Sequence, residues 1–235
     1  MSLLKQLKSE LGSKANSKKA KLLAGFFKTG KGEYAEGDIF LGITVPETRK
    51  TAKNFKDLPL AEVEELLRSP IHEERLCAIL LLVHNFNSGD DGVKKEIFDF
   101  YLKNTSKINN WDLVDLSSHK IIGEYLKNKS RDVLYSLARS KNLWERRIAI
   151  ISTFAFIRDG DFEEALKISE MLLGDKHDLI HKAVGWVLRE IGKKDLGVEE
   201  RFLRKNYPRL PRTTLRYAIE RFPEAKRKAF LNGNI

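Results

Sequence analysis

The sequence of 235 residues contains a single cysteine, and this scarcity excludes two kinds of site. Cys77 alone cannot build a disulfide framework, nor supply the several thiolates of a structural zinc or iron–sulfur centre. Long apolar runs are missing too, because the longest covers only residues 77–83, far short of a membrane span. Residues 1–10 carry three charged side chains and no central apolar block, so we expect no signal peptide. These absences indicate a soluble protein of a reducing compartment, and we expect it in the cytoplasm.

The composition is otherwise that of a folded protein. Apolar residues make up 42% of the chain and aromatic residues 9%, which suffices for a buried core and excludes a disordered or collagen-like chain. The length allows one large domain or two small ones. We expect a single domain over residues 1–235.

Positive charge is concentrated at the two ends. The chain has 43 Lys and Arg against 33 Asp and Glu, a net charge of +10. Residues 1–31 carry +7 and residues 201–235 carry +8, so the middle carries −5. This asymmetry favours a polyanionic partner, nucleic acid first and an anionic membrane second. Basic ends that merely increase solubility remain an alternative.

Apolar residues recur with a helical period through most of the chain. Trp144, Ile148, Ile151 and Ala155 follow i, i+4, i+7 and i+11, so they line one helical face. Alternating strand patterns are absent, and we predict an all-α protein. The long irregular stretch is residues 29–46, which we expect to be functional or mobile. The other predicted helices cover residues 60–69, 72–86, 92–104, 112–127, 131–140, 161–173, 177–192, 195–206 and 212–221.

Three segments resemble one another. Residues 74–79 (ERLCAI) match residues 145–150 (ERRIAI) at an offset of 71, and residues 181–185 (HKAVG) follow 36 positions later. Since 71 is about twice 36, the pattern predicts paired helices that recur near this period, as in a helical solenoid. The small residue in the third segment indicates a close helix contact. Chance likeness between amphipathic helices is the alternative.

A carboxylate and an indole share one face of the helix that begins near residue 111. Trp111 and Asp115 are separated by four residues, with Ser118 and Ile122 on the same stripe. Asp112 is explained by the first helical turn, where the helix dipole favours an acid. Asp115 lies beyond that turn, so it is either an ordinary solvent-facing acid or a functional one.

Two further helices carry candidate cations. Of the adjacent Arg146 and Arg147, Arg147 shares a stripe with Leu143 and Ile150, so we expect it to point inward. There it could pair with an acid such as Asp115 or bind a phosphate.

Lys182, Trp186 and Arg189 follow i, i+4 and i+7 in the helix predicted over residues 177–192. This arrangement suits contact with a sugar or base beside a phosphate. It equally suits a Trp packed beneath the apolar stems of two cationic side chains.

Other chemistries are disfavoured. His177 and His181 have the spacing of a zinc motif, but an Asp replaces the expected Glu and no third ligand is evident, so we expect no metal. Residues 30–32 (GKG) lack the ending of a phosphate-binding loop. Cys77 lies in an apolar run and is expected to be buried.

The assembled segments resemble the AlkD-like DNA alkylation repair glycosylases. The matching stretches run in order over nearly the whole chain: residues 27–34 (FKTGKGEY), 37–43 (GDIFLGI) with Pro46, 110–115 (NWDLVD), 143–150 (LWERRIAI), 181–190 (HKAVGWVLRE) and 211–218 (PRTTLRYA). Each stretch alone is a modest signal, but their combination is specific.

The resemblance implies a fold, a reaction and a set of residues. The fold would be a right-handed superhelical solenoid of HEAT-like antiparallel helix pairs with a basic concave face for duplex DNA. The reaction would be hydrolysis of the N-glycosidic bond of cationic alkylated purines such as 3-methyladenine and 7-methylguanine. By resemblance, Asp115 is the catalytic aspartate, Arg147 the cleft arginine, and Trp111 and Trp186 bracket the sugar. The implied DNA contacts are Lys28, Tyr34, Lys182, Arg189, Arg212 and Arg216.

The implied chemistry is self-consistent. An alkylated purine cation departs as a neutral base, so the transition state needs stabilisation of an oxocarbenium-like sugar rather than a proton donor. No cofactor is required. The expected protein is a monomer whose partner is duplex DNA and not a membrane. A non-catalytic HEAT-like module that binds nucleic acid, and a protein-binding scaffold, are the alternative functions.

Overall fold

The computed structural model describes residues 1–235 and is built of helices and connecting loops, which confirms the all-α prediction. The one strand-like pairing is an isolated parallel bridge between Ile39 and Ile71. No helix combines the length and the apolar character that crossing a membrane requires. The chain divides into two compact units, Met1–Ser117 and Ser118–Ile235. The expected single domain stays a prediction.

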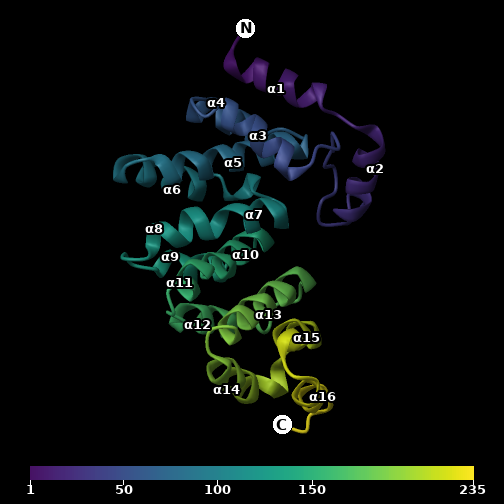
Figure 1. The fold of residues 1–235 in the computed structure, drawn as a ribbon, viewed down its shortest axis with the longest axis vertical. Helices are drawn as coiled ribbons and strands as arrows, with labels where there is room; N and C mark the ends of the chain where they lie inside the picture. The colour runs from purple at the N-terminus through teal and green to yellow at the C-terminus, as the bar shows by residue number, and fades with distance from the viewer. The chain divides into compact units, whose positions relative to one another are not determined.

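The first unit is built around α5 (His72–Ser88), whose residues 72–83 are all buried. Helix α5 therefore has no solvent-facing side over this length, and it packs against α1, α3, α4 and α6 (Figure 1). The unit ends with α7, which carries the predicted Trp and Asp. Its helices are α1 (Leu3–Ser13), α2 (Ser17–Phe26), α3 (Val45–Asn54), α4 (Leu60–Leu67), α5, α6 (Asp91–Lys103) and α7 (Trp111–Ser118), with a 3-10 turn at Thr105–Lys107.

The second unit is built around α13 (Asp178–Gly192), which contacts α10, α11, α12, α14 and α15. The unit begins with a π-helical turn, His119–Gly123, of a kind that is frequent at functional sites. Its other elements are α8 (Glu124–Leu126), α9 (Asp132–Ala138), α10 (Leu143–Ser152), α11 (Phe154–Arg158), α12 (Glu163–Leu172), α14 (Leu196–Asn206), α15 (Arg212–Ala218) and α16 (Glu224–Asn232), with 3-10 turns at Tyr207–Arg209 and Ile219–Arg221.

The sequence repeat corresponds to a repeated turn. In the helix pairs α4/α5, α9/α10 and α12/α13, the turn starts at a residue whose side-chain oxygen accepts the backbone N–H two positions on. A basic side chain six positions on donates to the carbonyl of that starting residue. The starting residues are Ser69, Ser140 and Asp175, and the basic residues are Arg75, Arg146 and His181. The predicted offset of 71 residues therefore separates the first two of these turns. The second and third turns are separated by 35 residues rather than the predicted 36.

Gly185 is the small residue at which two helices approach closely, as the sequence predicted. A Cβ at this position of α13 would come within 2.5 Å of the Tyr217 Cβ and 2.6 Å of the Thr214 carbonyl oxygen, both on α15. The hydroxyl of Thr214 in turn donates to the carbonyl of His181 at 3.1 Å. The absence of a side chain at Gly185 therefore allows α15 to pack directly on α13.

Every helix predicted from periodicity is present, with ends that move by a few residues. The predicted helix through residue 155 is divided at Thr153 into α10 and α11, and residues 112–127 include the π-helical turn. Four helices were not predicted, namely α1, α2, α3 and α16. The irregular stretch is shorter than expected, because Pro46 already belongs to the first turn of α3.

Candidate functional site

Helix α7 places two of the predicted site residues one turn apart. Asn110 precedes the helix, and its side-chain oxygen accepts the backbone N–H of Trp111 at 2.8 Å. Trp111 and Asp115 are both half-buried, in contrast to Leu113 and Val114, which are fully buried. The i, i+4 spacing thus leaves the indole and the carboxylate on the partly open side of α7.

Trp111 belongs to a stack of aromatic rings. Its indole lies parallel to the ring of Phe27, with a centroid distance of 5.0 Å and an interplanar angle of 12°. Phe27 stacks in turn on Phe40, at 5.0 Å and 25°. Tyr34 contacts the edge of the indole, since the Nε1 of Trp111 donates to its phenolic oxygen at 3.2 Å. The predicted sugar-bracketing Trp111 and DNA-contacting Tyr34 therefore touch each other.

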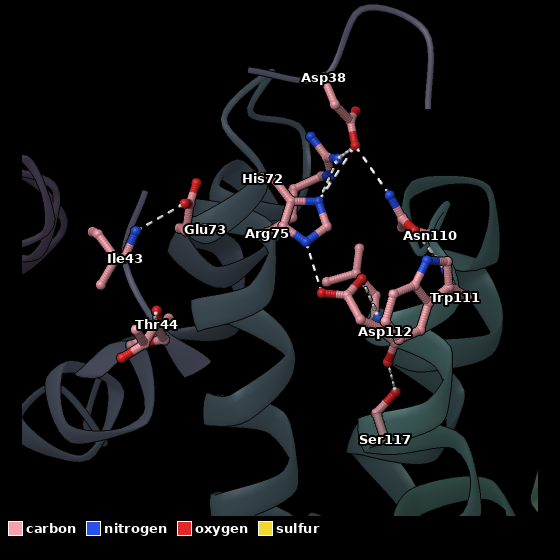
Figure 2. A network of polar contacts seen from close by, with 12 residues as sticks. Asp38, Ile43, Thr44, His72, Glu73, Arg75, Asn110, Trp111, Asp112 and Ser117 are labelled. Carbon is pink, nitrogen blue, oxygen red and sulfur yellow. Dashed lines mark hydrogen bonds and ion pairs between the residues drawn. The ribbon is translucent and has the colours of Figure 1, made fainter. Parts of the chain in front are cut away.

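The stack ends on a buried histidine that the sequence did not predict as part of the site. The ring of His72 lies on Phe40 with a centroid distance of 4.6 Å and an angle of 22°. Its Nε2 lies 2.8 Å from Asp112 Oδ2 and its Nδ1 lies 3.3 Å from Asp38 Oδ2 (Figure 2). Arg75 completes the network through an ion pair of 2.6 Å with the same Asp38 oxygen.

Both ring nitrogens of His72 face carboxylate oxygens, and an imidazolium can donate to both. Burial alone would lower the pKa of His72, but the hydrogen bonds to Asp112 and Asp38 outweigh it and raise the pKa to about 9. Burial likewise would raise the pKa of Asp38, and the charges and hydrogen bonds of His72 and Arg75 lower it. At neutral pH His72 is therefore protonated and Asp38 is ionised.

A second buried acid fastens the end of the irregular stretch. The carboxylate of Glu73, which is 1% exposed, accepts the backbone N–H groups of Leu41, Gly42 and Ile43 at 2.9, 2.8 and 3.2 Å. Residue Ile39 adds backbone hydrogen bonds to Pro70 and His72 at 3.0 and 2.8 Å. The segment 27–44, which carries Phe27, Tyr34, Asp38 and Phe40, is thus held firmly at the start of α5.

Asp112 has a role beyond the one predicted from the sequence. It does lie in the first turn of α7, where the sequence explained it by the helix dipole. It is also only 6% exposed and binds His72, so its role is larger than that of a first-turn acid. The sequence did contain a signal for a buried polar network. Four consecutive polar residues, 72–75 (HEER), directly precede the apolar run 77–83 in the same predicted helix, so some of them have to be buried with it.

An apolar cavity of about 350 Å³ lies beside this network within the first unit. Phe27, Phe40 and Leu76 form part of its wall, and His72 and Asp112 reach its surface. The buried side chains of His72 and Asp112 are therefore adjacent to a mainly apolar pocket.

In the second unit, Arg147 points inward as predicted. It is 5% exposed, and its Nη1 donates to the carbonyl of Leu179 at 2.6 Å. Its neighbour Arg146 turns the other way and forms an ion pair of 2.5 Å with Asp175. The sequence rule that one of two adjacent arginines faces the core is confirmed.

Trp186 is half-buried and lines a cavity of about 410 Å³. Its ring lies 4.7 Å from that of Phe154, tilted by 57°, and its Nε1 donates to Glu190 at 3.2 Å. Arg158, Lys193 and Lys194 also line this cavity, so its lining combines aromatic rings with cationic side chains.

The predicted DNA-binding cations fall into two groups. Lys182 forms an ion pair of 2.8 Å with Asp178, and Arg189 pairs with Glu220, so both charges are already compensated. The remaining three, Lys28, Arg212 and Arg216, are exposed. Lys28 lies two residues after the end of α2 and has a φ of 56°, a left-handed conformation that is uncommon for a residue with a side chain.

The predicted residues are distributed over both units. Lys28, Tyr34, Trp111 and Asp115 belong to Met1–Ser117, while Arg147, Lys182, Trp186, Arg189, Arg212 and Arg216 belong to Ser118–Ile235. Within the first unit, the structure brings Tyr34 and Trp111 together. The pairing of Asp115 with Arg147 stays a prediction.

The disfavoured metal and thiol residues have structural roles. His177 caps α13 by accepting the backbone N–H of Leu179, and His181 donates to the carbonyl of Asp175 at 2.6 Å. No group of three or more His, Cys, Asp and Glu side chains is arranged to hold a metal ion. Cys77 is fully buried as expected, and burial raises the pKa of its thiol to about 12.

These observations define an all-helical protein with a repeated helix-pair turn and a half-buried Trp–Asp pair on one helix. The chain belongs to the DNA alkylation repair enzyme family, whose model matches residues 7–222. A solved structure of a predicted DNA alkylation repair enzyme from Enterococcus faecalis is similar in fold, with a TM-score of 0.70 over 90% of this chain and 98% of that one. The two chains are 18% identical, so this likeness concerns the fold alone. The search of curated proteins found no match.

Proposed function

We propose that this protein is a DNA glycosylase that hydrolyses the N-glycosidic bond of purines alkylated at N3 or N7 in duplex DNA. The observation that carries the proposal is the family match over residues 7–222, which includes every residue of the candidate site. The half-buried Trp–Asp pair on α7 supports it, because this chemistry uses an aromatic face and a carboxylate.

The proposed reaction begins from a base that already carries a positive charge. As the bond from C1′ to the purine nitrogen breaks, its electron pair leaves with the base, which departs neutral, and positive charge develops on the sugar. The carboxylate of Asp115 stabilises that charge, and the π faces of Trp111 and Trp186 contribute in the same sense. Water then attacks C1′, with Asp115 orienting it and accepting its proton.

Arg147 is proposed to hold a backbone phosphate near the lesion. A guanidinium suits this role because it has several N–H donors, and the bond from Nη1 to the carbonyl of Leu179 uses only one of them. The exposed Lys28, Arg212 and Arg216 would bind phosphates directly, whereas Lys182 and Arg189 would have to exchange their carboxylate partners first.

The larger architecture and cellular setting complete the proposal. We propose that the helix pairs form a right-handed HEAT-like superhelix, that its concave face is basic, and that the protein acts as a cytoplasmic monomer without a cofactor. The repeated turn supports the helix-pair arrangement, and the basic chain ends support binding to DNA.

The test is release of free 7-methylguanine from methylated duplex DNA under single-turnover conditions. Asp115→Asn should slow release about 100-fold or more, since one electrostatic stabiliser of the transition state is lost. The matched control is Asp99→Asn, which removes an exposed acid of α6 that pairs with Lys95, and it should keep the wild-type rate.

Two results would overturn parts of the proposal. If the wild type binds duplex DNA but releases no base, the protein is a non-catalytic DNA-binding module. If Asp115→Asn and the wild type release base equally fast, the role of Asp115 is wrong.

A further inference from the structure

We propose that His72 is a positioning residue for Trp111, acting through its simultaneous contacts with Asp38, Asp112 and the aromatic stack. The proposal rests on the proposed function for its effect on catalysis, but its structural content can be measured without activity. His72 itself is only 2% exposed, so it acts through Trp111 and not by contact with DNA.

Two independent routes lead from His72 to Trp111. One is the hydrogen bond of 2.8 Å from Nε2 to Asp112, the residue that follows Trp111 in the first turn of α7 (Figure 2). The other is the ring stack, in which His72 lies on Phe40, Phe40 on Phe27, and Phe27 on the indole. A displacement of the imidazole would therefore reach both the backbone and the ring face of Trp111.

The contact with Asp38 connects the segment 27–44 to the same network of contacts. Asp38 Oδ2 lies 3.3 Å from His72 Nδ1, 2.6 Å from Arg75 Nη2 and 3.4 Å from the side-chain nitrogen of Asn110. Since Asn110 immediately precedes Trp111, this one carboxylate oxygen connects the loop, α5 and the start of α7.

The repeated turn shows that a histidine is not needed to build α5. In the other two equivalent turns, the position of His72 is occupied by Leu143 in α10 and Asp178 in α13, while the hydrogen bonds of the turn are the same. The basic residue six positions after the start of the turn does belong to the turn itself, and it is Arg75, Arg146 or His181. His72 therefore has a local purpose, and its partner on α7 identifies that purpose as holding the start of α7.

The charge balance makes this arrangement sensitive to pH. The groups that face His72 are Asp38 from the loop, Asp112 from α7 and Arg75 from α5, with Glu73 engaged nearby by three backbone N–H groups. Loss of the imidazolium proton leaves two buried carboxylates with one cation and removes a donor to one of them. Because the pKa of His72 is about 9, Trp111 should be displaced on the alkaline side of neutrality.

The first experiment follows the indole N–H resonance of Trp111 by NMR, assigned by its loss in Trp111→Phe. In the wild type this resonance should shift with a midpoint near pH 9. His72→Gln should move the resonance at pH 7 and abolish its titration. His84→Gln, which replaces a half-buried histidine of the same helix, should leave both unchanged. A resonance that neither titrates in the wild type nor moves in His72→Gln overturns the proposal.

The second experiment measures base release and duplex binding for the same variants. His72→Gln should lower the single-turnover rate about 10- to 100-fold at unchanged DNA affinity, because misplacement of a site residue slows the chemical step. Asp38→Asn keeps the hydrogen bond between His72 and Asp112, so it should lower the rate by a smaller factor. This variant takes the place of His72→Gln if the latter fails to fold. Equal rates in all variants and the wild type contradict the proposal, whereas a wild type without activity contradicts only the glycosylase assignment.

Discussion

The indole Nε1 of Trp111 donates a hydrogen bond to the phenolic oxygen of Tyr34 at 3.2 Å, across 77 residues of sequence. Tyr34→Phe removes the acceptor and keeps the ring, so Trp111 loses one of the contacts that orient it. We expect base release to slow about 3- to 10-fold and the unfolding free energy to fall by about 1 kcal/mol, the usual contribution of one hydrogen bond. Single-turnover assays and urea unfolding measure the two effects.

Tyr207→Phe is the matched control. The Tyr207 hydroxyl donates to the carbonyl of Phe230 at 2.6 Å, within the second unit, so this variant loses a hydrogen bond of the same kind. It should lose similar stability and keep the wild-type rate. A Tyr34→Phe protein that is as fast as the wild type would show that the hydrogen bond does not orient Trp111 for catalysis.

Sequence periodicity predicted the helices that bury an apolar face, with the exception of α1. The helix containing Trp144, Ile148 and Ile151 was readable because those residues recur at helical spacing and are buried. Helix α2 buries no side chain, and α3 buries only Thr48, Thr51 and Ala52, so neither has an apolar stripe to detect. Helix α1 did carry a signal, since Leu4, Leu7 and Leu11 are buried on one face.

The candidate site was predicted in part. Trp111 and Asp115 are neighbours on one helix, and helical spacing alone brings them together. His72 and Asp38 are separated by 34 residues, and His72 and Asp112 by 40, so only the folded chain brings these three together. No local pattern encodes that contact, because it depends on how segment 27–44 returns to α5.

The charge of the second unit gives a prediction about DNA affinity. Arg212 and Arg216 are exposed on α15, and no carboxylate pairs with either. The logarithm of the affinity falls with the logarithm of the salt concentration. If each arginine binds a phosphate, Arg212→Gln or Arg216→Gln should make this slope less steep by about 0.9. Lys182→Gln should have a smaller effect, because Lys182 must first leave Asp178. Fluorescence anisotropy with a labelled duplex at several salt concentrations measures the slope.

Lys167→Gln provides the control for this series. Lys167 is exposed on α12 and pairs with Glu163 at 2.5 Å, so its replacement should change neither affinity nor slope. Slopes that are identical in the wild type and both arginine variants would remove Arg212 and Arg216 from the DNA-binding surface.

The contact between α13 and α15 predicts a strong steric effect. Gly185→Ala places a methyl group 2.5 Å from the Tyr217 Cβ and 2.6 Å from the Thr214 carbonyl oxygen. Neither neighbour can move without moving α15, so we expect a loss of about 1–3 kcal/mol in the free energy of unfolding. Thermal and urea unfolding measure it.

Gly12→Ala is the comparison for the intrinsic effect of alanine. A Cβ at Gly12, within α1, would have no atom within 4 Å, so this variant should be neutral or more stable by about 0.5–1 kcal/mol. The prediction is wrong if Gly185→Ala proves as stable as Gly12→Ala.

Glu199 predicts a pH dependence of stability. The side chain is 2% exposed, and burial, assisted by the carboxylate of Glu200, raises its pKa to about 8 although Arg189 acts in the opposite direction. The folded state therefore binds this proton more tightly than the unfolded chain, whose carboxyl has the ordinary pKa of 4.5. Glu199 therefore lowers the free energy of unfolding as pH rises. This loss is absent below pH 4.5 and grows until about pH 8, by up to about 1.4 kcal/mol per pH unit.

Glu199→Gln should remove this dependence and be more stable than the wild type at pH 8, because the amide is never charged. Urea unfolding at intervals from pH 5 to pH 9 gives the difference between the two proteins, in which the titration of His72 cancels. Glu96→Gln replaces an exposed acid of α6 and should follow the wild-type curve. A difference between Glu199→Gln and the wild type that stays constant across this range would mean that Glu199 is ionised throughout, and that its buried carboxylate is stabilised by Arg189 more strongly than burial opposes it.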